Sequence, residues 1–374
     1  MLALACNLLW GGFIGASLIT LIWCAMARGT STAGSWAAFV ATSLFFAASI
    51  FRDPAINRDI LSYVYYSDLS RTMSALCFLI GVRFEPAQAL IVWTTSNASG
   101  GYQLYFAVMA AIMIGSSAII LKVIGPKFLL FAALTFPQFG FINSMSTIRW
   151  GAALYALAAA LALFDRANSF WRALGAGVGI MLHIGVAVAA AAGVVKHWAI
   201  RLTMIATGTA AIAFFLPTGE IASGSGIRYV LAFAASASLL FTAGATVKDD
   251  LAYRDHLVLI SCAALMSPLY FVSPHLTRFA VALLFISYLP LVLTSTPLLK
   301  NRLAVLTIMV VPFLAFGLEV ARPSCAVWSA DALAGAQQGE LEAGAIQYEG
   351  SMSLMEKNMN LVLGKHQPQC PVIP

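Results

Sequence analysis

"LALACNLLWGGFIGASLITLIWCAMA", residues 2–27, contains no charged side chain. A helix needs about 20 predominantly apolar residues to cross the hydrocarbon core of a membrane, and this run exceeds that length. It has no positively charged region ahead of it and is longer than the apolar segment of a secretory signal. We therefore expect it to be retained as a membrane helix.

Similar runs recur along most of the chain. Of its 374 residues, 61% are hydrophobic and 10% are charged, and the mean hydropathy is +0.88, which excludes a water-soluble globular protein. Backbone groups in lipid must be satisfied within their own segment, and strand-like alternation is scarce, so we predict an all-α polytopic integral membrane protein. The expected spans are residues 2–27, 34–51, 102–121, 128–144, 149–164, 198–216, 229–247, 256–272, 279–298 and 303–320.

Two stretches do not fit a single span. Residues 72–96 carry Arg83, Glu85 and Pro86 at their centre, where a lipid-exposed helix would not tolerate charge. We interpret this stretch as two half-helices that enter the membrane from one side. Residues 172–195 fit either one span or two short arms that meet near His183.

The distribution of positive charge predicts the orientation of the chain. With the N-terminus outside and both unusual stretches re-entrant, every lysine before residue 321 faces the cytoplasm. The outer side then collects arginine but no lysine: Arg52, Arg58, Arg71, Arg83, Arg149, Arg228 and Arg278. Because a guanidinium forms bidentate hydrogen bonds with phosphate or carboxylate, we expect an anionic ligand on the outer side.

The composition changes after residue 320. We predict a transmembrane domain over residues 1–320 and a polar extracytoplasmic tail over residues 321–374. Cys325 and Cys370 bracket this tail, and an outside location would allow them to form a disulfide; two unpaired thiols are the alternative. The sequence contains no glycine-rich nucleotide loop and no CxxC metal pattern, so we expect no cofactor, no metal site and no nucleic-acid partner.

The stretch "FRDPAINRDILSYVYY", residues 51–66, is the most polar part of the membrane region. Asp59, Tyr63 and Tyr66 follow i, i+4, i+7 spacing and share one face of a helix, with Arg52 at its entry. Aromatic rings beside a carboxylate are typical of sugar binding. The alternative is an interfacial aromatic belt with local ion pairs.

Further candidates lie at predicted helix ends. Arg83 and Glu85 lie where the two half-helices meet, either in a site or as a structural ion pair that caps a helix. Arg149 begins an otherwise uncharged helix, which is unfavourable for the helix dipole unless an anion binds there. His183 lies among apolar neighbours and is either functional or a satisfied core residue.

In order along the chain, "RDILSY", "FEPAQAL", "STIRWGAAL", "LHIGVAV" and "LTRFAVALL" resemble the EpsG/Wzy-type polysaccharide polymerases, which include O-antigen polymerases. The similarity extends from about residue 45 to about residue 295. It implies a GT-C-like glycosyltransferase fold with ten or more transmembrane helices and re-entrant half-helices. The implied location is the bacterial cytoplasmic membrane, with the active site facing the periplasm.

The resemblance also implies a reaction. A growing glycan would move from one undecaprenyl diphosphate to a sugar hydroxyl of another lipid-linked repeat unit, with membrane lipid and a chain-length-regulating co-polymerase as further partners. Without a metal-ligand pattern, arginines would stabilise the leaving diphosphate. We assign Arg149 and Arg278 to the diphosphate, with Arg52 or Arg83 helping. The base is Asp59, Glu85 or His183, and Asp59 is favoured because a carboxylate beside arginines stays ionised.

Two other functions remain open. An O-antigen ligase would transfer a finished glycan to lipid A, but ligases usually carry a larger late external loop than "FVSPHLTR". A flippase or another transporter of lipid-linked oligosaccharides is the second alternative. Transporters tend to show internal repeats and charges near the membrane midplane, whereas here the charges gather at one face.

Overall fold

The structure is a computed structural model. It describes residues 2–27, 30–51, 58–82, 84–98, 101–140, 148–164, 169–195, 197–215, 251–266 and 277–293. Within these ranges all regular secondary structure is helical, so the all-α prediction is confirmed for this part of the chain.

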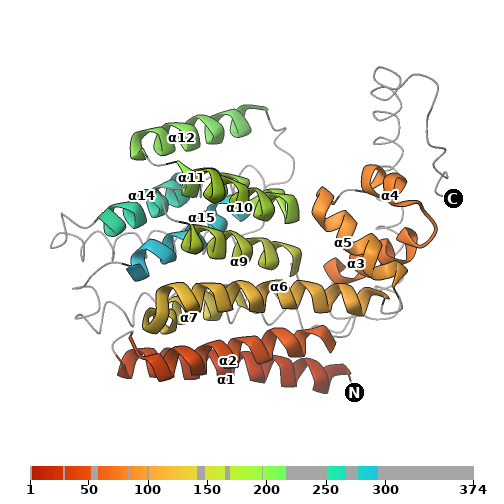
Figure 1. Cartoon of the computed structure of the whole chain (residues 1–374), viewed down its shortest axis with the longest axis horizontal. Coiled ribbons are helices and arrows are strands. Elements are labelled where there is room, and N and C mark those ends of the chain that lie inside the picture. Colours follow the sequence, from red (N-terminus) through yellow and green to blue (C-terminus); the bar gives the residue numbers. More distant parts are fainter. Residues whose placement is uncertain are drawn as a thin grey trace.

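The N-terminal half forms one side of a helical bundle (Figure 1). Helix α1 (Leu2–Met26) packs against α2 (Thr32–Ala48), which continues into the short η1 (Ser49–Phe51). Both contact the hairpin made by α6 (Gly101–Ile124) and α7 (Phe128–Thr135). The chain reverses at η3 (Gly125–Lys127), where Gly125 has φ of +57°, a conformation that favours glycine. A π-helical turn, η4 (Phe136–Gly140), extends α7.

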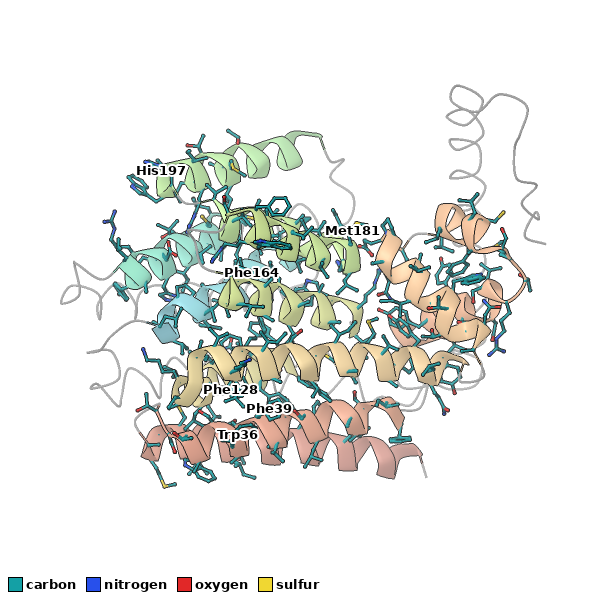
Figure 2. All side chains as sticks on the ribbon, in the orientation of Figure 1. Trp36, Phe39, Phe128, Phe164, Met181 and His197 are labelled. Carbon is teal, nitrogen blue, oxygen red and sulfur yellow. The ribbon has the colours of Figure 1, made fainter. Side chains whose placement is uncertain are left out.

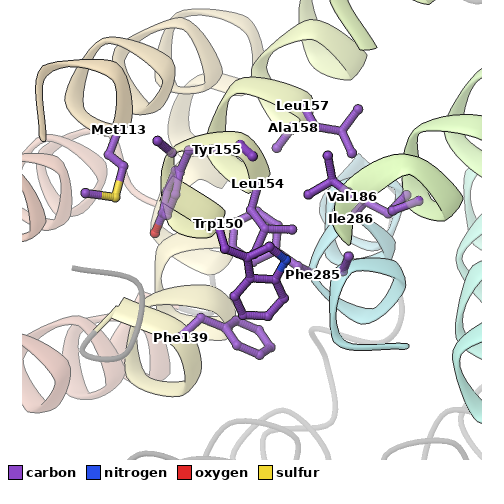
Figure 3. Close-up of a cluster of buried hydrophobic side chains, with 14 of the residues drawn as sticks. Met113, Phe139, Trp150, Leu154, Tyr155, Leu157, Ala158, Val186, Phe285 and Ile286 are labelled. Carbon is purple, nitrogen blue, oxygen red and sulfur yellow. The ribbon is translucent and has the colours of Figure 1, made fainter. Parts of the chain in front are cut away.

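The second half stacks further helices on α6. Helix α9 (Ile148–Leu163) packs between α6 and α10 (Ser169–Leu182). The remaining helices are α11 (Ala187–Val194), α12 (Trp198–Phe215), α14 (Leu251–Met266) and α15 (Thr277–Leu293). Helix α15 packs against α7, α11 and α14, and its buried Phe285 meets Tyr155 of α9 with ring centres 5.2 Å apart (Figure 3).

Short helices occur where the sequence predicted half-helices. Residues 72–96 form α4 (Ala75–Gly81) and α5 (Pro86–Asn97), which together with α3 (Arg58–Ser70) lie at one end of the bundle beside α6 (Figure 1). Residues 172–195 also break: α10 ends before His183, and η5 (Ile184–Val186) leads into α11. Two arms that meet near His183 are therefore the correct alternative for this stretch.

Large apolar side chains cover the outward helix faces. On α2, Trp36, Val40 and Leu44 follow one stripe at 56%, 50% and 65% exposure (Figure 2 labels Trp36). On α10, Phe170, Leu174 and Val178 repeat the pattern. Two helical stretches, 32–51 and 101–140, are long and apolar enough to cross a membrane, and five shorter apolar helices accompany them. A soluble protein rarely exposes such stripes, so these faces suit contact with lipid.

The expected spans agree with the helices wherever the structure describes them. Helices α1, α2, α6, α9, α12, α14 and α15 and the α7–η4 segment occupy eight of the predicted ranges, with ends that differ by a few residues. Residues 229–247, 303–320 and 321–374 lie outside the described residues. The number of spans, the GT-C-like fold and the domain boundary at residue 320 therefore stay predictions.

Candidate functional site

Glu85 lies in the break between α4 and α5. Its backbone is extended, with φ of −62° and ψ of 150°, and Pro86 begins the next helix at a position where its missing N–H costs nothing. The Glu85 side chain makes no capping bond to its own helix. Instead, its Oε2 accepts a hydrogen bond from Arg149 Nη1 at 3.1 Å and its Oε1 accepts one from Ile184 N at 2.8 Å. The carboxylate thus links α9 with the start of η5.

Arg149 occupies the first turn of α9, as the sequence predicted. Its side chain is 16% exposed, and that of Glu85 is 14% exposed. The guanidinium carbon lies 4.9 Å from the centre of the Phe84 ring, a cation–π contact that also orients the arginine. A cation at a helix N-terminus opposes the helix dipole, and here the Glu85 carboxylate supplies the compensating negative charge.

His183 separates α10 from η5 and caps the start of η5. Its backbone is extended, and Nδ1 accepts a hydrogen bond from Gly185 N at 2.8 Å. Nδ1 also lies 3.8 Å from Glu85 Oε1. His183 is therefore both part of the cluster and a structural cap.

Gly185 is required beside this histidine. A Cβ at residue 185 would lie 2.9 Å from His183 Nδ1 and 3.0 Å from its Cε1, with Trp150 Cδ1 at 3.5 Å. Real Cβ atoms essentially never approach other atoms to less than 3.0 Å. Because Gly185 has no Cβ, the His183 imidazole can lie against the Gly185 backbone.

The structure therefore joins Glu85, Arg149 and His183, three predicted site residues from separate segments. The N-terminal ends of α5, α9 and η5 meet at the Glu85 carboxylate. Helix N-termini attract anions because their backbone N–H groups and dipoles point outward. We call the three residues the Glu85 cluster.

Tyr63 and Tyr66 of α3 lie behind this cluster. Both rings are buried, at 4% and 3% exposure. Tyr66 contacts Phe84 with ring centres 4.7 Å apart, and Tyr63 contacts Phe84 at 6.0 Å and Tyr105 at 5.3 Å. In this structure they support the ring over which Arg149 lies, and their sugar-binding role stays a prediction.

The other predicted site residues are described less fully. Asp59 lies in the first turn of α3 and Arg278 in the first turn of α15, with only the backbone described at both positions. Arg52, Arg83, Cys325 and Cys370 lie outside the described residues. Among the described residues, no three His, Cys, Asp or Glu side chains form a group suited to a metal ion.

Sequence analysis missed three features of this end of the bundle. Phe84 binds the Arg149 guanidinium, and its signal was an aromatic residue between the two charges of "VRFEP". The buried Trp150 follows Arg149, and its Nε1 has no hydrogen-bond partner in the described part of the chain (Figure 3). Cys77 of α4 is disulfide-bonded, while Cys24 and Cys262 are free thiols and cannot be its partner.

Comparisons with known proteins agree with the expected resemblance. Residues 36–216 match the model of the EpsG family. This region extends from α2 to α12 and contains every member of the Glu85 cluster. No curated protein and no solved structure matches the chain.

Proposed function

Because residues 36–216 belong to the EpsG family, we propose that this chain is a membrane glycosyltransferase that polymerises polysaccharide. It joins undecaprenyl-diphosphate-linked oligosaccharide repeat units at the outer face of the bacterial cytoplasmic membrane. The proposal rests on the Glu85 cluster. There, the Arg149 guanidinium and the Ile184 N–H, each at the N-terminus of a helix, bind an anion, the Glu85 carboxylate.

The carboxylate of Glu85 occupies the place that we assign to the donor diphosphate. Arg149 Nη1 and Ile184 N each donate to one of its oxygens, and a phosphate oxygen accepts from the same kinds of donor. We propose that the diphosphate displaces Glu85 from Arg149. Until then, Glu85 keeps the partly buried guanidinium paired, which avoids the cost of an uncompensated charge.

The transfer step needs charge stabilisation at the leaving group. The bond between the anomeric carbon of the donor sugar and the phosphate oxygen breaks, and its electron pair stays on the diphosphate. Arg149, with Arg278 as the second proposed arginine and Arg52 or Arg83 assisting, stabilises that negative charge. The acceptor hydroxyl oxygen forms the new bond to the anomeric carbon, and its proton passes to a base.

Asp59 remains our proposed base. In a single displacement the hydroxyl attacks from the face opposite the leaving phosphate, so the base does not lie beside the diphosphate. Glu85 is bound directly to Arg149, and His183 Nδ1 is engaged by Gly185 N. Asp59 lies on a different helix, α3, which leaves it as the candidate for the acceptor side.

The disulfide at Cys77 supports an outward-facing site. Disulfides form and persist in oxidising compartments such as the bacterial periplasm. Cys77 lies in α4, eight positions before Glu85 and within the same pair of half-helices. This location favours the orientation predicted from the lysine distribution, in which Glu85 and Arg149 face outward.

A reconstituted reaction tests the proposed function. The purified full chain in liposomes is mixed with a lipid-diphosphate-linked repeat unit, and the lengths of the glycans are measured. We expect products of two or more units that remain on the lipid diphosphate, and about 100-fold less of them with Arg149→Lys. Transfer of the glycan only to lipid A would support the ligase alternative. Translocation of the lipid without lengthening would support a transporter, and either result would overturn the polymerase proposal.

A further inference from the structure

Three tryptophans near the starts of helices are exposed. Trp36 lies one turn into α2, Trp171 lies in the first turn of α10, and Trp198 begins α12. Their exposed fractions are 56%, 48% and 51%. An indole combines a large apolar ring with an N–H group, so the interface between lipid headgroups and hydrocarbon suits it better than water or hydrocarbon alone. We call these three residues the tryptophan belt.

The tryptophan belt lies at one end of the bundle. Figure 1 shows the starts of α2, α10 and α12 at the end away from α3, α4 and α5. Helix α2 begins beside η3, the turn that follows α6. Trp171 stacks on Phe164, directly after the end of α9, with ring centres 6.4 Å apart. The belt and the Glu85 cluster are therefore at opposite ends of α9.

Exposed side chains without aromatic rings follow each tryptophan along its helix. These apolar side chains are Val40 and Leu44 on α2, Leu174 and Val178 on α10, and Ile200 and Met204 on α12. The amphipathic rings thus come at the end of the bundle, and purely apolar surface comes next. This order matches the change from headgroups to hydrocarbon on entering a leaflet.

The belt extends around the bundle. Helices α2 and α12 lie on opposite sides of it, with α6, α9 and α10 between them (Figure 1). A single protein partner would cover one side, whereas a bilayer contacts every side of a membrane protein at the same level. Exposed tryptophans on both sides therefore favour lipid as the occupant of this surface.

We propose that the tryptophan belt lies at the lipid–water interface of one leaflet and sets the depth of the bundle, so that the Glu85 cluster lies inside the hydrocarbon region, near its opposite boundary. Arg149 precedes Phe164 by fifteen residues, which corresponds to about 22 Å along a helix. The hydrocarbon core is about 30 Å thick. Tilt of the helix shortens its length along the membrane normal, which leaves the cluster inside this core.

A second helix supports this depth. Phe51 follows Trp36 by fifteen residues, at the end of η1, and is 83% exposed. A phenyl ring has no polar group, so hydrocarbon suits it better than water. At a similar distance from the belt, Glu85 and Arg149 are only 14% and 16% exposed, as expected of charged groups that face the interior of a bundle at membrane depth.

The lysines assign the belt to a leaflet. Lys122 at the end of α6 and Lys127 in η3 lie at the belt end of the bundle, and lysine-rich loops stay on the cytoplasmic side. The belt then lies in the cytoplasmic leaflet. The depth itself requires only that the bundle spans a bilayer, so it holds equally for a polymerase, a ligase or a transporter.

Quenching by brominated lipids tests the belt. The full chain is reconstituted in phosphatidylcholine liposomes that carry bromine either near the headgroup or near the end of one acyl chain. The contribution of each tryptophan is the fluorescence lost in Trp36→Phe, Trp171→Phe or Trp198→Phe. We expect bromine near the headgroup to quench these contributions more strongly than bromine near the chain end. Trp150 is buried, and its contribution, measured with Trp150→Phe, is the control that neither lipid should quench.

Two results would overturn the proposal. Stronger quenching of the belt by bromine near the chain end would place it at the wrong depth. Quenching by neither lipid would show that water or a second copy of the chain covers the rings.

Two added tryptophans test the depth. Val178→Trp lies seven residues beyond Trp171 on an exposed face of α10, so bromine near the chain end should quench it more than bromine near the headgroup. Phe51→Trp should be quenched by the brominated lipids and protected from iodide in water. Quenching of Phe51→Trp by iodide alone would place this level outside the hydrocarbon and contradict the depth of the Glu85 cluster. Melting temperatures show whether both variants fold, and the native tryptophans decide the proposal if they do not.

Discussion

Arg149 and Glu85 lie 64 positions apart in the sequence, yet Nη1 of the first donates to Oε2 of the second at 3.1 Å. The pair joins the start of α9 to the break between α4 and α5. Ile184 N, at the N-terminus of η5, donates a second hydrogen bond to the Glu85 carboxylate. The proposed donor site depends on the donor diphosphate replacing the Glu85 carboxylate at this point.

Replacing Arg149 by lysine keeps the charge and removes the planar fork that binds phosphate through two hydrogen bonds. We expect Arg149→Lys to lower polymer formation by about 100-fold, the scale of losing one preorganised donor to a developing anion. The measurement is polysaccharide chain length on a gel, with the amount of protein in the membrane determined in the same strain.

Arg71→Lys is the control for this substitution. Arg71 pairs with Asp68 at 3.7 Å, but both side chains are exposed, at 50% and 67%, and exposed pairs contribute about 1 kcal/mol or less. Its chain-length distribution should match the wild type. Normal long chains in Arg149→Lys would remove the case for diphosphate binding there.

Substitutions of His183 separate a chemical role from a capping role. Asparagine is a favourable N-cap residue, so His183→Asn should keep the hydrogen bond to Gly185 N, whereas His183→Ala should lose about 1 kcal/mol of stability. We expect His183→Asn to retain most activity and His183→Ala to lose it. The readouts are chain length and melting temperature. If His183→Asn is stable but inactive, His183 and not Asp59 becomes the leading candidate for the base.

Gly185→Ala should disrupt the cluster without changing any charge. The added Cβ would lie 2.9 Å from His183 Nδ1, so the imidazole must shift from its position in the cluster. Gly177→Ala on α10 is the matched control, because a Cβ there meets nothing within 4 Å and alanine suits a helix interior better than glycine by about 1 kcal/mol. We expect activity to fall in Gly185→Ala and to persist in Gly177→Ala. Equal activity in both would show that the position of His183 is unimportant.

Asp59→Asn tests the proposed base. Asparagine preserves the size of the side chain but does not take up a proton from an attacking hydroxyl. Lipid-linked single repeat units should then accumulate without long chains, as seen by mass spectrometry of extracted lipids. Near-wild-type chain lengths at normal protein levels would contradict the assignment of Asp59.

Much of the fold follows from local sequence signals. Apolar runs predicted α1, α6 and α9, and the charges of "VRFEP" predicted the break between α4 and α5. The break at His183 was one of two alternatives, because an apolar stretch with a single histidine does not distinguish a continuous helix from two arms. The capping bond from Gly185 N decides this point, and it depends on backbone geometry.

The candidate site was less predictable than the helices. Arg149 was expected to need an anion, and Glu85 was expected either to act in a site or to form an ion pair that caps a helix, but no pattern in the sequence pairs these two residues. Their contact results from the packing of α9 and α10 against η5 and of α5 against α10, which is a long-range property of the chain. The burial of Tyr63 and Tyr66 likewise depends on Phe84 and Tyr105, which neighbouring sequence does not reveal.

Glu85→Gln tests most directly whether Glu85 holds the place of the donor diphosphate. Glutamine preserves the shape but removes the negative charge, so the variant should lose about 2 kcal/mol of stability, the scale of one hydrogen bond to a charged group. At the same time, Arg149 no longer has a competing carboxylate. The measurement is the dissociation constant of a lipid diphosphate for the purified wild type and for Glu85→Gln. The account predicts tighter binding by the folded variant, and equal or weaker binding would contradict it.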